Sequence, residues 1–218
     1  MQLGWRSGLR VVMNIIPEIS DVYVFGVYTG ASIEEIAHMY RANGKKIDRL
    51  FCFDSFVGLP PTTENYHEDW QEGSYNTFDY WQAKDLCECQ DKICDFAFRN
   101  YPKPREVIFI QGFFNQSLTD ELVKKCKMVQ ASYIDIDVDL YSSAKEVLDF
   151  VFKNKIADIG TSIGYDDWGG TPGWEECKDG ESLAHVETME KYGAECQLFA
   201  QFGTTYPQVQ VMYKVINR

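Results

Sequence analysis

The sequence predicts an α/β fold with a doubly wound, largely parallel sheet that has an antiparallel edge. Three observations indicate this fold: strand-like and helix-like segments alternate, acidic pairs end two short apolar runs, and two further strand-like runs close the chain. The 218 residues suffice for one large domain, and no linker rich in Pro, Gly or Ser divides them. We therefore expect a single domain over residues 1–218.

The first unit of the predicted fold is a strand followed by a helix. Residues 22–27 form a short apolar run typical of a buried strand, and residues 30–42 carry apolar side chains at helical spacing. Asn43 and Gly44 follow this helix, where a left-handed cap is expected. The apolar run 49–53 predicts the second strand.

The later segments repeat this alternation. Predicted strands cover 106–110, 131–137 and 159–165, and predicted helices cover 118–129, 142–152 and 174–192. Two further runs, 195–202 and 208–215, predict closing strands. Such strand–helix units followed by closing strands are the doubly wound pattern with an antiparallel edge.

Composition narrows the class of function. The net charge is -12, from 21 basic and 33 acidic residues, and no basic footprint for nucleic acid is visible. We therefore expect a small-molecule substrate. No apolar run approaches the roughly 20 residues that span a membrane, and the N-terminus lacks a signal-peptide layout. An odd, mostly scattered set of 7 cysteines also predicts reduced thiols in a cytoplasmic protein.

Three of the cysteines form a local cluster, Cys87, Cys89 and Cys94. A structural zinc site needs about four ligands, usually in spaced pairs, and this cluster has no partner pair. We favour plain thiols on or near a helix over a zinc site.

Two acidic pairs follow predicted strands, Asp137 with Asp139 and Asp166 with Asp167. The carboxyl ends of parallel strands meet at one edge of a sheet, so we expect these side chains to converge. Such a cluster repels itself unless a cation or protons neutralise it, and oxygen ligands suit Mg²⁺, Mn²⁺ or Ca²⁺. In the alternative reading, the second pair caps a helix or starts a turn. Two pairs at consecutive strand ends favour the metal site.

A glycine-punctuated turn follows the first predicted strand. Gly26 would let a ligand approach the strand end, and Gly30 would let the helix start tightly against it. The full G-x-G-x-x-G spacing of a dinucleotide site is absent, which favours a nucleoside ligand without phosphates. Asp54 ends the second strand, where an acid can accept hydrogen bonds from ribose hydroxyls; the alternative is that it caps the turn at Ser55.

The segment 60–81 is rich in aromatic residues and has no clear period. It leaves directly from a strand end, so we favour a lid over the site. The alternative is an irregular insert that packs its aromatic side chains on the domain or on a second subunit.

Five motifs occur in an order that resembles the S-adenosylmethionine-dependent O-methyltransferases of the macrocin type, which methylate sugar hydroxyls of macrolide and aminocoumarin natural products. They lie at residues 25–32, 53–60, 112–118, 136–143 and 165–168. The most specific are Phe-Asp-Ser-Phe-Val-Gly-Leu-Pro at 53–60 and Ile-Asp-Val-Asp-Leu-Tyr-Ser-Ser at 136–143.

The resemblance implies a class I methyltransferase fold, with a Rossmann-like seven-stranded sheet, and Mg²⁺ or Mn²⁺ beside S-adenosylmethionine. It also makes a homodimer plausible. By position, the cofactor residues would be Gly26, Tyr28, Gly30 and Ser32 at the methionine part, Asp54 and Ser55 at the ribose, and Gly112 and Phe113 at the adenine. The metal ligands would be Asp137, Asp166 and Asp167, and the general base would be Asp139. Val24 replaces a Glu that the family usually carries before the first glycine.

The residues support this chemistry independently. Asp137 and Asp139 are two apart in the chain, so on a strand they face the same side. A metal can lower the pKa of a hydroxyl, and a nearby carboxylate can take its proton. One rival is a Mg²⁺-dependent phosphohydrolase, but the phosphate clamp it needs at strand ends is not visible. The other is a non-catalytic binding protein; the acidic pairs argue against it, since an unused acidic cluster only destabilises.

Overall fold

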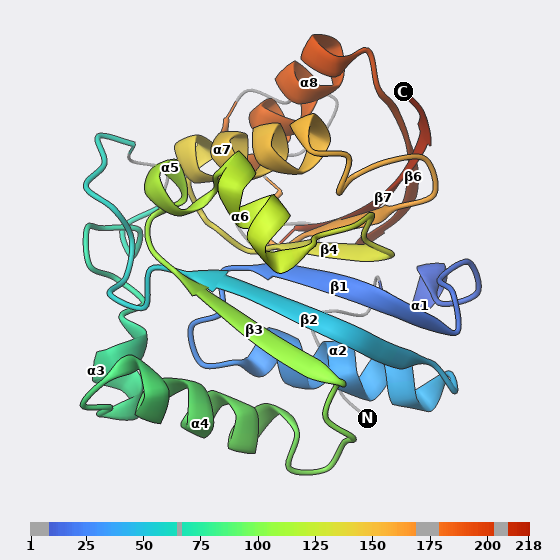
Figure 1. The fold of residues 1–218 in the computed structure, drawn as a ribbon. Coiled ribbons are helices and arrows are strands. Elements are labelled where there is room, and N and C mark those ends of the chain that lie inside the picture. Colours follow the sequence, from blue (N-terminus) through green and yellow to red (C-terminus); the bar gives the residue numbers. More distant parts are fainter. Residues whose placement is uncertain (1–8, 65–66, 169–178, 203–208) are drawn as a thin grey trace.

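The computed structural model describes residues 9–64, 67–168, 179–202 and 209–218 and contains one seven-stranded sheet in the order β3-β2-β1-β4-β5-β7-β6 (Figure 1). Five strands pair in parallel: β1 (Ile19–Phe25), β2 (Lys46–Asp54), β3 (Glu106–Gln111), β4 (Tyr133–Ile136) and β5 (Ser162–Tyr165). The antiparallel edge consists of β7 (Gln210–Asn217) beside β5 and β6 (Glu195–Phe202) beside β7. The predicted doubly wound sheet with an antiparallel edge is confirmed.

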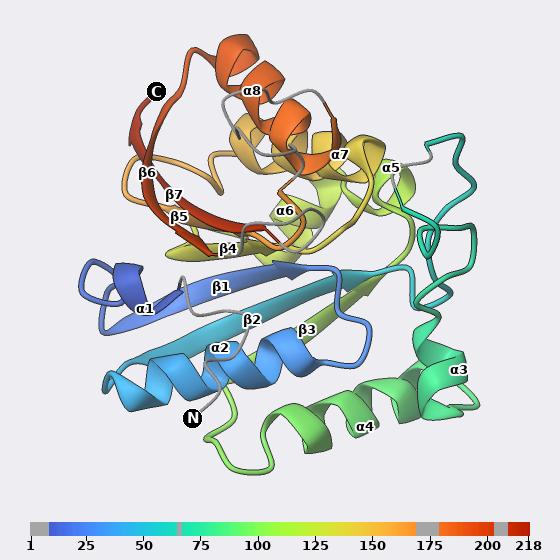
Figure 2. The ribbon, with the colours of Figure 1, turned by 180° about the vertical axis from the view of Figure 1, so that it is seen from behind.

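Helices cover both faces of the sheet. One face carries α1 (Leu9–Val12), α2 (Ala31–Ala42) and α4 (Leu86–Ala97), as Figure 2 shows. The other face carries α5 (Phe114–Ser117), α6 (Asp120–Cys126), α7 (Tyr141–Lys153) and α8 (Gly180–Tyr192). A further short helix, α3 (Thr77–Trp81), lies in the segment between β2 and α4. No helix in the described ranges is long and apolar enough to cross a lipid bilayer.

The central strands divide their side chains between two cores because successive residues of a strand point to opposite faces. In β1, Tyr23 and Phe25 enter the core under α7 and α8, whereas Val22 and Val24 enter the core under α2. Tyr23 stacks on Phe51 of β2 with ring centroids 4.6 Å apart. Val24 is fully buried, so the residue that departs from the family pattern is a core residue.

Several predicted boundaries shift for identifiable reasons. β1 begins at Ile19, three residues before the predicted start, because its polar opening residues are paired: the buried Asp21 carboxylate forms an ion pair with Arg49 of β2. Helix α8 begins at Gly180; the predicted start, residues 174–178, lies outside the described residues. Cys87, Cys89 and Cys94 lie on α4, which the sequence analysis did not delimit, with Cys89 buried and Cys87 exposed.

A close approach inside the sheet yields a test of its packing. A Cβ at Gly164 of β5 would lie 2.4 Å from the hydroxyl oxygen of Tyr133 on β4. That hydroxyl donates a 2.6 Å hydrogen bond to Asp135, which is 1% exposed. The missing side chain at Gly164 therefore makes room for a buried phenol–carboxyl pair.

We predict that Gly164→Ala lowers the free energy of unfolding by about 1–3 kcal/mol, the usual cost of overpacking a core. Urea denaturation measures it. The same substitution in a Tyr133→Phe background removes the nearest clashing atom, so its penalty there should be smaller. Equal penalties in the two backgrounds would contradict this account of the packing.

Candidate active site

A cavity of about 950 Å³ opens at the carboxyl ends of β1, β2, β4 and β5. Its acidic lining residues are Asp54, Asp69, Asp137, Asp139, Glu146, Asp166 and Asp167. Among the described residues that line it there is no Lys or Arg. An anionic ligand would therefore meet repulsion on most sides of this cavity.

The turn after β1 is built around one very close backbone approach. Gly26 has φ 85°, and a Cβ there would lie 1.7 Å from the carbonyl oxygen of Asp137. The Gly26 N–H donates to Phe53 of β2, and the Asp137 N–H donates to Phe25 of β1, both at 3.0 Å. Gly26 thus lets the ends of β1 and β4 meet, which brings the acidic strand end beside the glycine turn.

Asp54 ties this turn to the end of β2. Its Oδ2 accepts hydrogen bonds from the N–H groups of Val27 at 2.7 Å and Tyr28 at 3.1 Å, and its Oδ1 accepts one from Phe56 at 2.6 Å. Burial raises the pKa of Asp54, and these three N–H groups act in the opposite direction. The capping role is therefore present. A carboxylate can accept about four hydrogen bonds, so Asp54 also keeps capacity for a ligand.

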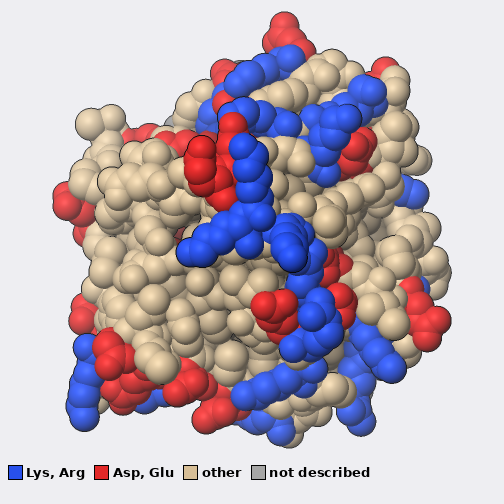
Figure 3. All heavy atoms as spheres, in the orientation of Figure 1, with Lys and Arg blue, Asp and Glu red and all other residues tan. Residues whose placement is uncertain are grey.

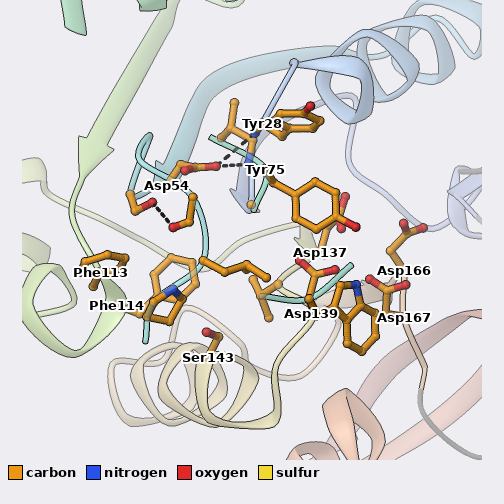
Figure 4. A pocket seen from close by; sticks show the side chains of 18 of the residues that line it. Tyr28, Asp54, Tyr75, Phe113, Phe114, Asp137, Asp139, Ser143, Asp166 and Asp167 are labelled. Carbon is orange, nitrogen blue, oxygen red and sulfur yellow. Dashed lines mark hydrogen bonds between the residues drawn. The ribbon is translucent and has the colours of Figure 1, made fainter. Parts of the chain in front are cut away.

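Three carboxylates from two strand ends converge as the sequence predicted. Asp137 follows β4, and Asp166 and Asp167 follow β5; each offers an oxygen within 4.8 Å of those of the other two. Figure 4 shows these side chains turned toward the same part of the cavity as Asp139. Gln210 of β7 donates a hydrogen bond to Asp166 and fixes its orientation.

Asp139 lies two residues before α7 and has a left-handed backbone conformation, with φ 62°. This conformation is uncommon for a residue other than glycine and costs energy, which the surrounding structure must supply. Burial raises the pKa of Asp139 well above its usual value, and repulsion from Asp137 and Asp166 raises it further. The pKa of Asp167 is likewise well above its usual value, first through burial and then through Asp139 and Glu181.

Glu181 is an acidic neighbour of the cluster that the sequence analysis missed. This fully buried residue in the first turn of α8 accepts hydrogen bonds from the N–H groups of Val138 at 3.3 Å and Asp167 at 3.1 Å. From the sequence alone, the Glu and Lys residues of the predicted helix 174–192 are expected on its outer face. A signal was available, because Glu181 precedes the buried Ala184 and Thr188 by three and seven residues, the spacing of one helix face.

This arrangement fits a divalent cation. Its donors are carboxylate oxygens, the ligands that Mg²⁺ and Mn²⁺ prefer. Asp166 is buried and Asp137 and Asp167 are half-buried; these acids repel one another, and no basic side chain among the described lining residues offsets them. Asp137, Asp166 and Asp167 could hold the cation, with Glu181 behind them orienting the backbone of Asp167.

The segment 60–81 forms one wall of the cavity, within its described residues 60–64 and 67–81 (teal in Figure 1). Its lining residues are Pro60, Pro61, His67, Asp69, Trp70 and Tyr75. Glu64 anchors it: its carboxylate accepts the N–H groups of Tyr141 at 2.7 Å and Ser142 at 3.0 Å, which caps a helix whose own N-cap, Leu140, has no capping side chain. The position suits a lid, and its motion stays a prediction.

The structure gathers the predicted cofactor residues at the other end of the same cavity. Those that line it are Gly26, Tyr28, Ser32, Asp54, Ser55, Gly112 and Phe113. Gly30 is not among the lining residues. It opens α2 with φ 84°, and a Cβ there would lie 2.9 Å from Ile93 of α4, so this glycine serves helix packing.

A model of the family described as Macrocin-O-methyltransferase (TylF) matches residues 8–182. The chain is also similar to the solved structure of the O-methyltransferase NovP, with 19% identity and a TM-score of 0.61 over 98% of this chain and 78% of that one. No protein with a curated description matches the sequence significantly.

Two further solved structures resemble the chain. The calicheamicin methyltransferase CalS11 has 16% identity and a TM-score of 0.58 over 97% of this chain and 77% of that one. The N-methyltransferase NodS from Bradyrhizobium japonicum WM9 has 12% identity and a TM-score of 0.52 over 98% of this chain and 93% of that one. At these identities the likeness establishes the fold, that of class I methyltransferases.

The raised pKa values of Asp139, Asp167 and Glu181 predict that the metal-free chain loses stability as pH rises. The unfolded chain releases these protons near pH 4, whereas the folded chain holds them to higher pH, so stability falls across that interval. Urea denaturation in EDTA at pH values from about 4 upward measures the slope. Burial lowers the pKa of His185 to about 3, so this group opposes the slope between about pH 3 and its unfolded value near 6.5, and Glu181→Gln, which leaves His185 unchanged, separates the two effects.

Two controls isolate the acidic cluster as the source of that slope. Millimolar Mg²⁺ should flatten it, because a bound cation favours the ionised carboxylates. Glu181→Gln, which removes one buried acid, should also flatten it in EDTA. An unchanged slope under both conditions would assign the pH dependence to other groups.

Proposed function

Because the chain belongs to the macrocin O-methyltransferase family, it is an S-adenosylmethionine-dependent O-methyltransferase, and we propose that it methylates a hydroxyl of a small, sugar-containing acceptor with a divalent cation. One observation carries the proposal: the glycine turn with Asp54 and the acidic ends of β4 and β5 face one cavity. That cavity can hold an electrophile and a nucleophile side by side, and alignment of this kind is a large part of catalysis.

We propose that S-adenosylmethionine binds against the turn after β1. The methionine part would lie against Gly26, Tyr28 and Ser32, and the ribose would contact Asp54 and Ser55. The adenine would lie between Gly112 and Phe113 on the far side of the cavity. In this arrangement Gly30 acts on the cofactor only by starting α2 close to the turn.

The acceptor hydroxyl would be activated and deprotonated at the acidic end of the cavity. When bound, S-adenosylmethionine brings an electrophilic methyl group, and the cation lowers the pKa of the acceptor hydroxyl. Asp137, Asp166 and Asp167 would hold the cation, and Asp139 would take the acceptor proton. The raised pKa of Asp139 makes it a stronger base than a surface carboxylate, while a cation beside it favours the ionised form that accepts a proton.

Charge supports a small acceptor that is neither a polyanion nor a phosphate ester. On the face drawn in Figure 3, the basic side chains form a central band with acidic ones beside it. Several basic side chains of the chain form ion pairs, such as Lys153 with Asp120 and Arg105 with Asp48. The described cavity lining has no Lys or Arg to clamp a phosphate, which argues against the phosphohydrolase alternative. A homodimer and a cytoplasmic address stay predictions.

The first prediction from this proposal concerns the cofactor. Calorimetric titration of the wild-type chain with S-adenosylhomocysteine should give micromolar binding. Asp54→Asn should weaken the binding of S-adenosylhomocysteine at least about tenfold. The substitution replaces one carboxylate oxygen with an NH₂ group, which cannot accept the hydrogen bonds that backbone N–H groups donate to Asp54. Asp48→Asn is the matched control on the same strand, where Asp48 pairs with Arg105 at the surface. Equal weakening in the two variants, or no binding at all, would contradict the cofactor site.

The second prediction concerns the acid end. Methyl transfer from S-adenosylmethionine to a panel of methyl glycosides and glycosylated natural products, followed by mass spectrometry, should require Mg²⁺ or Mn²⁺ and stop in EDTA. Asp139→Asn should lower the rate by about 10²–10⁴, the usual contribution of a general base, with S-adenosylhomocysteine binding unchanged. Asp149→Asn is the control, because Asp149 lies on α7, the helix that follows Asp139, but pairs with Lys191 of α8 and is not a cavity-lining residue. Full activity of Asp139→Asn would exclude this base.

A further inference from the structure

Tyr75 brings a phenol from the lid to the acidic end of the cavity. Figure 4 shows its hydroxyl turned toward the acidic end of the cavity, where Asp139 and Asp167 act on its pKa. Burial raises the pKa of Tyr75 to about 12, and Asp139 and Asp167 add to the shift, so the hydroxyl keeps its proton at neutral pH. The lid therefore presents a hydrogen-bond donor to a part of the cavity where most side chains are carboxylates, which accept hydrogen bonds.

A backbone clamp holds Tyr75 in this position. The Leu59 N–H donates to the carbonyl of Ser74 at 2.9 Å, and the Gly73 N–H donates to the carbonyl of Leu59 at 3.0 Å. Gly58 makes the approach feasible, because a Cβ there would lie 2.4 Å from the Gly73 carbonyl oxygen. The segment 58–59, just before the lid, thus meets the segment 73–74 immediately before Tyr75.

The backbone of Tyr75 itself is strained, with φ 61° in the left-handed region. An aromatic residue adopts this conformation only when its surroundings impose it, and such residues concentrate at functional sites. Its ring packs edge-on against Tyr28 of the glycine turn, with centroids 5.4 Å apart. The side chain therefore touches the cofactor end while its hydroxyl faces the acid end.

Trp70 determines the direction of the phenolic proton. Its side chain is 3% exposed and hydrogen-bonds to the Tyr75 hydroxyl. An indole N–H can only donate, so the phenol oxygen accepts this bond and its own proton points elsewhere. The phenol is then free to donate to an oxygen in the cavity.

We propose that Tyr75 determines acceptor specificity by donating a hydrogen bond to an acceptor oxygen adjacent to the hydroxyl that is methylated. The inference rests on the proposed function and deepens it. It narrows the class of acceptor to molecules with two neighbouring oxygen atoms, such as the vicinal diol of a sugar ring. Asp139 would take the proton from one oxygen while Tyr75 holds the other, which fixes the angle of the nucleophile.

The test compares wild-type and Tyr75→Phe chains on a methyl glycoside that the wild type methylates and on its deoxy analogue, which lacks the adjacent hydroxyl. The wild type should prefer the diol by about tenfold in kcat/KM, the value of one well-placed hydrogen bond. Tyr75→Phe should raise KM for the diol about 3- to 10-fold and lose most of that preference, with S-adenosylhomocysteine binding unchanged. A merely structural role would lower activity on both compounds equally.

Tyr80→Phe is the matched control, because Tyr80 of α3 is 53% exposed, also packs on Tyr28 and is not a cavity-lining residue. It should behave as the wild type. Unchanged KM and unchanged preference in Tyr75→Phe would overturn the inference and leave the methyltransferase proposal intact. Failure of the wild type to methylate any member of the panel, despite binding S-adenosylhomocysteine, would overturn the proposed acceptor class and this inference together.

Discussion

Repulsion among closely spaced carboxylates is the interaction around which this site is organised. Two full charges 4.8 Å apart repel by about 3–4 kcal/mol at an effective dielectric constant of 20, and Asp137, Asp166 and Asp167 lie within that distance of one another. Glu181 adds a fourth, fully buried acid. A domain is stable by only about 5–15 kcal/mol, so this cluster cannot remain fully ionised without a counter-charge. Protons supply it in the metal-free chain, and a divalent cation would supply it in the working enzyme.

The sheet places this cluster beside the cofactor turn through a single contact between strand ends. Gly26 lies so close to the Asp137 carbonyl that any side chain there would displace β4 or the turn. Asp54 then gathers the turn by accepting the N–H groups of Val27 and Tyr28. Because one glycine and one carboxylate join three strand ends, the backbone would set the distance between the electrophile and the nucleophile of the proposed reaction.

The sequence predicted what depends on local pattern, and it failed where the partners are far apart in the chain. The doubly wound sheet, its antiparallel edge and the meeting of Asp137 with Asp166 and Asp167 follow from periodicity and from the rule that parallel strands end at one edge. Glu181 was missed because its partner Val138 is 43 residues away, and Glu64 because Tyr141 is 77 residues away. Periodicity shows which side of an element is buried, but it does not show which distant backbone group a side chain will meet.

The attachments of the lid connect acceptor recognition to the base. Glu64 satisfies the N–H groups of Tyr141 and Ser142 in the first turn of α7, and Asp139 lies two residues before that turn. Moving the lid away would leave both donors without this partner, at a cost of about 1 kcal/mol for a lost helix cap, so the closed position is favoured by a similar amount. The same segment carries Tyr75. If the segment moves as a lid, closure would bring the phenol of Tyr75 into place and stabilise the helix start next to Asp139, so an acceptor that engages Tyr75 would also favour the geometry proposed for removing its proton.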